Sequence, residues 1–182
     1  MQKQRGFTLI ELLVAMAIIG ILVRLAAPSF IGMIRSSNMT SAVNSYLADL
    51  RYARSEAIRR GAVVIMCRSD TPEAAVPSCG TGSASGWETG WIIFQDANSN
   101  ADYAAGEPLL RVQAAVTAVN VITDSVGSTK FQFTATGQLK SNVNSTITFG
   151  GAPLYTTTTK RVVCVTLGGR GKVAGDGTAT CP

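Results

Sequence analysis

The N-terminal segment constrains the fold of this chain most strongly, because it is almost continuously apolar. Residues 7–23 read FTLIELLVAMAIIGILV, with Thr8 and Glu11 as the polar exceptions. As a helix, the stretch from Phe7 to Ala27 would be about 31 Å long, close to the ~30 Å hydrocarbon core of a bilayer. The sequence therefore predicts a membrane-spanning helix, which we place over residues 7–34.

A short basic leader, MQKQRG, precedes the apolar run. A secretory signal peptide is cut after its apolar segment, whereas the small residue Gly6 lies before this one. Cleavage at Gly6 would remove residues 1–6 and keep the helix. This arrangement resembles the class III leader of type IV pilins and type II secretion pseudopilins. The resemblance implies that a prepilin peptidase of the bacterial inner membrane cuts between Gly6 and Phe7 and methylates the new N-terminus on Phe7.

Glu11 places a carboxylate inside the apolar run. A carboxylate in hydrocarbon costs about 2.5–3.5 kcal/mol and therefore needs a partner. Cleavage would create an α-amino group at Phe7, four residues earlier and on the same helix face. The pilin resemblance implies that the amine of a neighbouring subunit pairs with this carboxylate and sets the register of a filament. Alternatively, Glu11 complements the N-terminal dipole of its own helix.

Beyond the anchor, residues 35–61 have the spacing of an amphipathic helix, and Gly61 suits its C-terminal cap. Its apolar positions recur every three or four residues: Val43, Tyr46, Leu47, Leu50, Ala53, Ala57 and Ile58. Short β-like runs then begin at residues 62, 90, 108, 119, 130, 145 and 160, separated by turn-forming clusters. We therefore expect an α+β fold, in which the long N-terminal helix packs on an antiparallel sheet and residues 62–182 form a β-rich periplasmic head.

The head sequence narrows the resemblance. The segments WETGWIIFQDANSNADYAAGEPLL (87–110), FTATGQL (133–139) and VVCVTLGGRGK (162–172) are similar to the GspH/FimT/FimU minor pilins. The aromatic side chains of Trp87, Trp91 and Phe94 are expected in the core. The polar stretch that follows is expected to form a hairpin loop. An alternative is calcium binding by its alternating oxygen side chains, at Asp96, Asn98, Asn100 and Asp102.

Four cysteines allow three disulfide pairings. A head outside the inner membrane would lie in an oxidising compartment, where disulfides persist. We favour Cys67–Cys79 and Cys164–Cys181, because each pair closes a short segment that contains Gly or Pro. The second bond would pin the C-terminal tail back onto its strand.

The sequence contains no histidine. Its absence excludes Ser-His-Asp triads, Cys-His pairs and HExxH zinc sites. No CxxC motif is present either, which argues against zinc ribbons and thioredoxin-type chemistry. Apart from the calcium alternative, we expect a protein without catalytic activity, cofactor or metal.

Positive charge gathers in the C-terminal part of the chain. Residues 62–127 carry two basic and seven acidic side chains, whereas residues 128–182 carry six basic and one acidic. The segment GRGK at 169–172 is similar to the GRxR motif of FimT-type pilins that bind DNA in natural transformation, with Lys172 in place of the second arginine. The resemblance implies DNA binding by Arg170 and Lys172, and Lys160 and Arg161 are further candidates. No aromatic residue lies between Arg170 and the C-terminus, so binding of double-stranded DNA should be sequence-independent. Alternatively, this loop is a solvated hairpin.

Together these features predict a minor pilin that assembles with other pilins, through its N-terminal helix, into the tip or initiation complex of a type IV pilus. The alternative is a GspH-like minor pseudopilin of the type II protein secretion system, because both classes share this helix. Before assembly the chain would reside in the bacterial inner membrane with a periplasmic head. After assembly it would lie in the pilus or pseudopilus.

Overall fold

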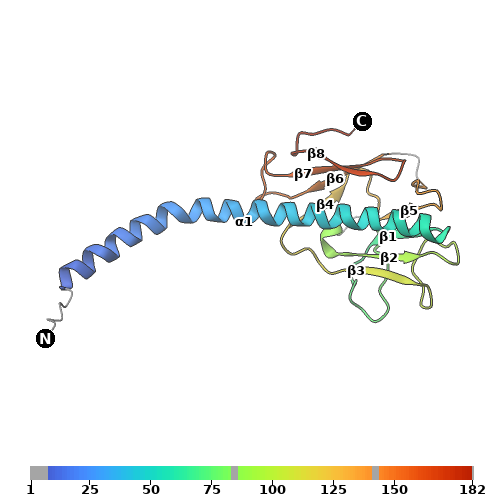
Figure 1. Cartoon of the computed structure of the whole chain (residues 1–182), viewed down its shortest axis with the longest axis horizontal. Helices are drawn as coiled ribbons and strands as arrows, with labels where there is room; N and C mark the ends of the chain where they lie inside the picture. Colours follow the sequence, from blue (N-terminus) through green and yellow to red (C-terminus); the bar gives the residue numbers. More distant parts are fainter. Residues whose placement is uncertain (1–7, 83–85, 141–143, 182) are drawn as a thin grey trace. The chain divides into compact units, whose positions relative to one another are not determined.

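A computed structural model describes residues 8–82, 86–140 and 144–181 of the chain (Figure 1). The chain divides into two compact units, Met1–Ser37 and Asn38–Pro182, which are described separately below. A single helix, α1 (Leu9–Arg60), contributes to both. The second unit, the head, also contains β1 (Val64–Arg68), the 3-10 helix η1 (Trp87–Thr89), β2 (Trp91–Gln95), β3 (Leu109–Gln113), β4 (Ile122–Asp124), β5 (Lys130–Phe133), β6 (Ser145–Phe149), β7 (Arg161–Val165) and β8 (Gly171–Gly175).

The first unit consists of the N-terminal half of α1. Its large apolar side chains are exposed, from Leu9 at the first turn to Ile34 near the end of the unit. Among the described residues, α1 is the one helix whose length and apolar composition would allow it to cross a membrane. An exposed apolar surface of this extent is stable only against lipid or against other apolar helices.

In the head, the C-terminal half of α1 buries the predicted apolar stripe. Six of its seven predicted members are buried, whereas Ile58 is half exposed, so the prediction is wrong at that position. The helix ends in a Schellman motif, in which the N–H of Ala62 donates to Ala57 O and that of Gly61 to Ile58 O. Gly61 adopts φ +62°, which confirms the predicted cap.

The strands form two antiparallel four-stranded sheets, with the orders β3-β2-β1-β5 and β4-β6-β7-β8. Each of the seven predicted β-like runs overlaps one strand, and β8 is an eighth that the sequence did not predict. Figure 1 shows β6–β8 on one side of the C-terminal half of α1 and β1–β3 on the other. The predicted α+β architecture is confirmed, with two sheets packed against the helix.

One hydrophobic core joins α1 to both sheets. Alternation along β1 sends Val64 and Met66 into this core, whereas Ile65 and Cys67 belong to a smaller cluster on the opposite face of the sheet. At the centre of the main core, Tyr46 of α1 makes edge-to-face contacts with three aromatic rings, at centroid distances of 5.3–5.5 Å. Those rings are Trp87, Trp91 and Phe149. The three aromatic residues predicted to be core, Trp87, Trp91 and Phe94, are all buried.

A polar contact fixes α1 to the first sheet. The buried carboxylate of Asp49 accepts a hydrogen bond from Trp91 Nε1 at 2.8 Å and pairs with the guanidinium of Arg111 on β3. The Arg111 guanidinium also lies 4.4 Å from the ring centroid of Tyr52, a cation–π distance. These contacts occupy both oxygens of the Asp49 carboxylate. Asp49 is one of two acidic residues on this half of the helix.

Candidate functional site

The predicted cleavage and methylation residues, Gly6 and Phe7, lie outside the described residues. The motif that follows them is described, and Thr8 caps the N-terminus of α1. The Glu11 carboxylate accepts hydrogen bonds from the backbone N–H and the hydroxyl of Thr8, both at 2.9 Å, while the Glu11 N–H donates to Thr8 Oγ1 at 3.3 Å. This is a capping box, a Thr-x-x-Glu signature that is legible in the sequence. Glu11 therefore complements its own helix N-terminus, as the local alternative predicted.

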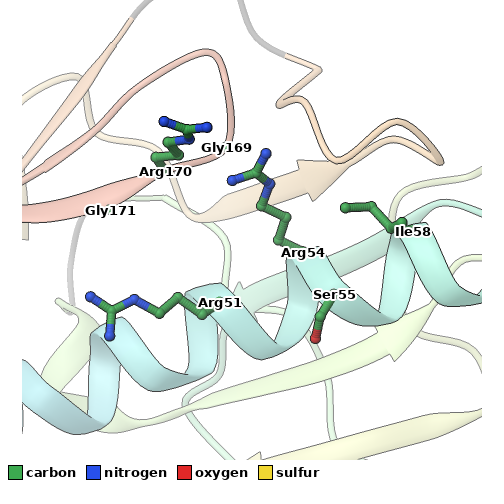
Figure 2. Close-up of a pocket in the computed structure, with 7 residues that line it drawn as sticks. All are labelled: Arg51, Arg54, Ser55, Ile58, Gly169, Arg170 and Gly171. Atoms are coloured by element: carbon green, nitrogen blue, oxygen red, sulfur yellow. The ribbon is translucent and has the colours of Figure 1, made fainter.

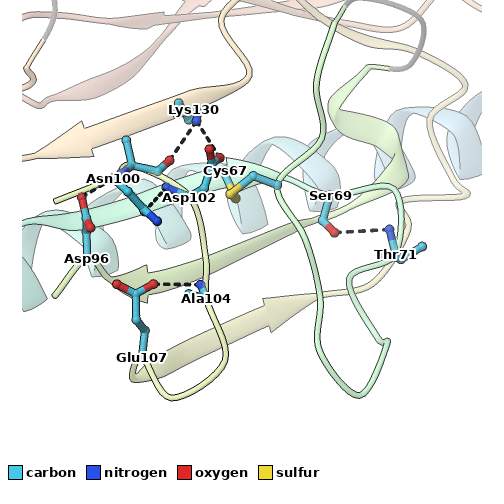
Figure 3. The surroundings of a disulfide bond; sticks show 11 residues. Cys67, Ser69, Thr71, Asp96, Asn100, Asp102, Ala104, Glu107 and Lys130 are labelled. Carbon is cyan, nitrogen blue, oxygen red and sulfur yellow. Dashed lines mark hydrogen bonds and ion pairs between the residues drawn. A yellow bond between two sulfur atoms is a disulfide. The ribbon is translucent and has the colours of Figure 1, made fainter. Parts of the chain in front are cut away.

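The polar loop between β2 and β3 is held by its own side chains (Figure 3). The Glu107 carboxylate accepts a hydrogen bond from the N–H of Ala104 at 2.9 Å. Asn98 Oδ1 accepts one from the N–H of Asn100, and Asn100 Oδ1 accepts one from the N–H of Asp102. These are Asx-type turns, in which a side-chain oxygen replaces a backbone acceptor.

A lysine ammonium bridges this loop to strand β5 of the same sheet. Nζ of Lys130, on β5, lies 2.8 Å from Ala101 O and 2.8 Å from Asp102 Oδ1. Asp96 Oδ2 accepts a hydrogen bond from the Ala101 N–H. Within the described residues, no group of three or more Cys, Asp or Glu side chains is arranged to hold a metal. The geometry favours the predicted hairpin loop over the calcium alternative.

Both cysteine pairs favoured from the sequence are bonded in the structure. Cys67 of β1 is joined to Cys79 over a sequence separation of 12. Cys164 of β7 is joined to Cys181, which returns the C-terminal tail to that strand over a separation of 17 residues.

The basic C-terminal segment forms the hairpin between β7 and β8. Its turn is closed by hydrogen bonds from the Thr166 N–H to Arg170 O at 3.0 Å and from the Gly169 N–H to Thr166 O at 2.8 Å. Gly169 adopts φ +71°, a conformation that favours glycine. The hairpin register pairs Val165 with Gly171 and Cys164 with Lys172.

Glycines let this hairpin lie directly against α1 and the turn that follows β5. A Cβ at Gly169 would stand 2.2 Å from Gly137 O, and a Cβ at Gly171 would stand 2.8 Å from Leu47 Cδ2 on α1. Such distances exclude a larger side chain without displacement of the backbone or the core. The close approach brings Arg170 beside the exposed face of the helix.

The helix and the hairpin together border a groove of about 390 Å³. Its lining residues are Arg51, Arg54, Ser55 and Ile58 of α1, and Gly169, Arg170 and Gly171 of the hairpin. Figure 2 shows the Arg54 side chain rising from α1 toward the hairpin that carries Arg170. Ile58, which the sequence pattern assigned to the core, forms part of the wall of this groove.

The cations of the groove have no carboxylate partner among the described residues. The salt bridges and side-chain hydrogen bonds of the head do not include the guanidinium groups of Arg51, Arg54 and Arg170. The nearby Glu56 carboxylate is already bound by Arg59 and Arg60, at 2.6 and 2.7 Å. Hydrogen bonds from Arg59, the larger effect, and from Arg60 lower the pKa of Glu56 to about 2.

The structure separates the remaining predicted DNA-binding residues from this groove. Lys172 is exposed on β8 but is not among the residues that line the groove. Lys160 and Arg161 lie at the far end of β7, roughly 13 Å along the strand from the turn. The guanidinium of Arg161 donates to Lys160 O at 2.8 Å and Thr158 O at 3.3 Å. Of the four candidates, only Arg170 lines the groove.

Two family comparisons match most of the chain. The family described as "Type II transport protein GspH" matches residues 42–171, and the "Prokaryotic N-terminal methylation motif" matches residues 1–23. Two curated proteins called "Fimbrial protein", both from Pseudomonas aeruginosa, are 40% identical to this chain over 73 residues. That alignment covers 40% of this chain and 46% of each relative, so the chain spans less than half of their length.

Two crystal structures of the type IV minor pilin FimU from Pseudomonas aeruginosa have a similar fold. Their TM-scores are 0.56 and 0.60, at 20% and 21% sequence identity. The superpositions cover 78% and 79% of this chain and 96% and 93% of the FimU chains. The family matches, together with the apolar helix and the two-sheet head, lead to one conclusion: this chain belongs to the GspH family and has a pilin-like fold.

Proposed function

We propose that this chain is a minor pilin that assembles with other pilins into the tip or initiation complex of a type IV pilus. The observation that carries the proposal is the single helix α1, which is exposed and apolar in its first half and buried in the head in its second. Such a helix can leave lipid for a bundle of similar helices without exposing apolar surface to water. The 40% identity to two proteins called "Fimbrial protein", over 73 residues, supports the pilus over the secretion alternative.

Assembly begins with removal of residues 1–6 by a prepilin peptidase in the inner membrane and methylation of Phe7. The freed amine of one subunit then pairs with the Glu11 carboxylate of its neighbour. The capping box supports this step, because it holds the carboxylate at the first turn of the helix. Pairing replaces an exposed local hydrogen bond with an ion pair in an apolar bundle.

Two matched variants of the full chain test this step in the native host. Thr8→Ala removes the cap hydroxyl and keeps the carboxylate, whereas Glu11→Ala removes the carboxylate. We expect Glu11→Ala to be processed and folded but absent from sheared filaments, and Thr8→Ala to be incorporated. Equal loss of both variants from filaments would show that Glu11 acts through its own helix N-terminus. Normal incorporation of Glu11→Ala would refute the pairing.

The alternative assembly is the pseudopilus of the type II protein secretion system, which the description of the matching family favours. Deletion of the gene distinguishes the two. Loss of surface pili with normal export of secreted proteins supports the pilus, and the reverse result supports the pseudopilus.

A second activity, sequence-independent binding of double-stranded DNA for uptake, is favoured by the position of Arg170. Its guanidinium lies on an exposed turn and has no partner among the described residues. A gel shift with the full chain in neutral detergent, across a salt series, tests this activity beside Arg170→Ala/Lys172→Ala. Salt-sensitive binding that the double variant loses supports it. Absence of binding at low salt would leave an assembly subunit only.

A further inference from the structure

The groove between α1 and the β7–β8 hairpin gathers cations from two distant parts of the sequence. Arg51 and Arg54 come from the helix, and Arg170 comes from the hairpin turn. We infer that these three arginines form one phosphate-binding groove, in which α1 contacts the DNA backbone from one side and the hairpin from the other. This inference rests on the proposed DNA binding and extends its site from the hairpin to the helix.

The first argument is the charge of the groove. Three guanidinium groups border it, and the two carboxylates on this half of α1 are bound elsewhere, Asp49 by Arg111 and Glu56 by Arg59 and Arg60. Like charges that share a groove repel one another, so their proximity lowers the stability of the free head. A bound polyanion neutralises these charges and removes the repulsion. The relief of the repulsion adds to the affinity of the head for the polyanion.

The second argument is an unfilled hydrogen-bond donor. Nε of Arg54 is shielded from solvent and has no acceptor among the described residues. A buried N–H without an acceptor destabilises the folded state, so such groups are rare in folded proteins. Figure 2 shows this side chain directed into the groove, where an oxygen-rich anion is the complementary ligand.

The third argument concerns the kind of anion. Arg51 and Arg54 are three residues apart, a rise of about 4.5 Å along the helix, which suits a ligand with closely spaced charges. Duplex DNA carries one charge per about 1.7 Å of its axis. The lining contains no aromatic side chain on which a base could stack, and guanidinium groups suit phosphate oxygens. The groove therefore suits the phosphodiester backbone of duplex DNA rather than its bases.

The glycines on either side of Arg170 allow the hairpin turn to pack tightly against the rest of the head, where it forms one wall of the groove. Gly169 lies against the Gly137 carbonyl, and Gly171 lies against the Leu47 and Leu50 side chains. The backbone of Arg170, between these two glycines, is therefore held close to the helix, while its side chain is exposed. A backbone that is already in place loses less conformational entropy when the arginine binds.

The test measures DNA binding by single arginine variants of the full chain in neutral detergent. The probe is a short fluorescein-labelled duplex of mixed sequence, followed by anisotropy between about 50 and 300 mM salt. Arg51→Gln, Arg54→Gln and Arg170→Gln are compared with Arg59→Gln. The control changes the same charge on the same helix at a 64% exposed side chain that is already paired with Glu56. Thermal unfolding, followed by tryptophan fluorescence, checks that each variant is folded.

We expect each of the three groove variants to lower the salt slope by about one and the affinity by about eightfold at 0.1 M salt, as the loss of one phosphate contact requires. Arg59→Gln should change the affinity less than twofold, because its charge is already screened by a carboxylate.

The other outcomes separate this inference from the proposed DNA binding. If Arg170→Gln weakens binding while Arg51→Gln and Arg54→Gln match the Arg59→Gln control, DNA binding stands and the contribution of α1 is refuted. If the wild-type chain does not bind the duplex at any salt, both proposals fail. If polyglutamate displaces the duplex as well as inorganic polyphosphate does, the groove binds acidic proteins and the phosphate assignment is overturned.

Discussion

Replacing Gly169 by alanine tests whether the β7–β8 hairpin is pinned where the groove requires it. The new Cβ would stand 2.2 Å from Gly137 O. The turn would have to move by about 1 Å to restore a normal contact, and overpacking of this kind costs about 1–3 kcal/mol. Gly169 also has φ +71°, a conformation that costs an alanine about 1–2 kcal/mol. The two effects predict a loss of about 2–5 kcal/mol in the free energy of unfolding.

The adjacent Gly168 provides a matched control in the same turn. The nearest atom to a Cβ at that position is Thr166 Oγ1 at 3.9 Å, and its φ is not in the left-handed region. Gly168→Ala should therefore leave stability unchanged or raise it by about 0.4–1 kcal/mol, because alanine restricts the unfolded chain.

Tryptophan fluorescence during heating is a suitable assay, since Trp87 and Trp91 are the two tryptophans of the chain and both are buried in the head. We expect Tm to fall by roughly 10 °C in Gly169→Ala and not to fall in Gly168→Ala. Equal Tm values in the two variants would refute the close contact between Gly169 and Gly137. The displaced turn should also weaken DNA binding, although Gly169→Ala changes no charge.

Three further predictions concern the head. Asp49→Ala leaves a buried tryptophan N–H without its acceptor and should lower the free energy of unfolding by about 2–4 kcal/mol, measured by denaturant unfolding. The control Asp102→Ala removes an exposed ion pair and should lower it by less than about 1 kcal/mol. Because the pKa of Glu56 is lowered from 4.5 to about 2, its contribution is present above pH 4.5 and lost as the pH falls toward 2; Glu56→Gln should flatten the pH dependence of Tm in that window. Replacing both cysteines of Cys164–Cys181 by serine should cost about 3 kcal/mol, and unchanged denaturant midpoints would contradict the cross-link's role.

The strands of the head were largely predictable because most carry a local signal. Runs of β-branched and aromatic residues, such as STITF at β6, predict a strand without knowledge of its neighbours. Strand β8 was missed because GKVAG contains two glycines and one β-branched residue. It is a strand because the edge of β7 offers it hydrogen-bond partners, which is a tertiary effect that the sequence does not display.

The candidate site was only half predictable for a related reason. The glycine-flanked Arg170 stood out as a local motif, whereas Arg51 and Arg54 resembled any charged face of an amphipathic helix. More than a hundred residues separate these arginines from the hairpin, and only the fold brings them to one groove. The spacing of Ile58 fits the stripe and predicts a core position, but its side chain is half exposed and lines the groove.

The placement of the two cross-links also bears on how the disulfides of the head form during folding. Cys67 belongs to the first sheet and Cys164 to the second, and each bonds to a partner within 12 or 17 residues. Every alternative pairing would close a loop of roughly a hundred residues, about three doublings longer, at an entropic cost of about 0.6 kcal/mol per doubling. Each sheet can therefore be oxidised independently as it forms. We therefore expect a thiol oxidant alone to give the native connectivity during refolding, without a disulfide isomerase.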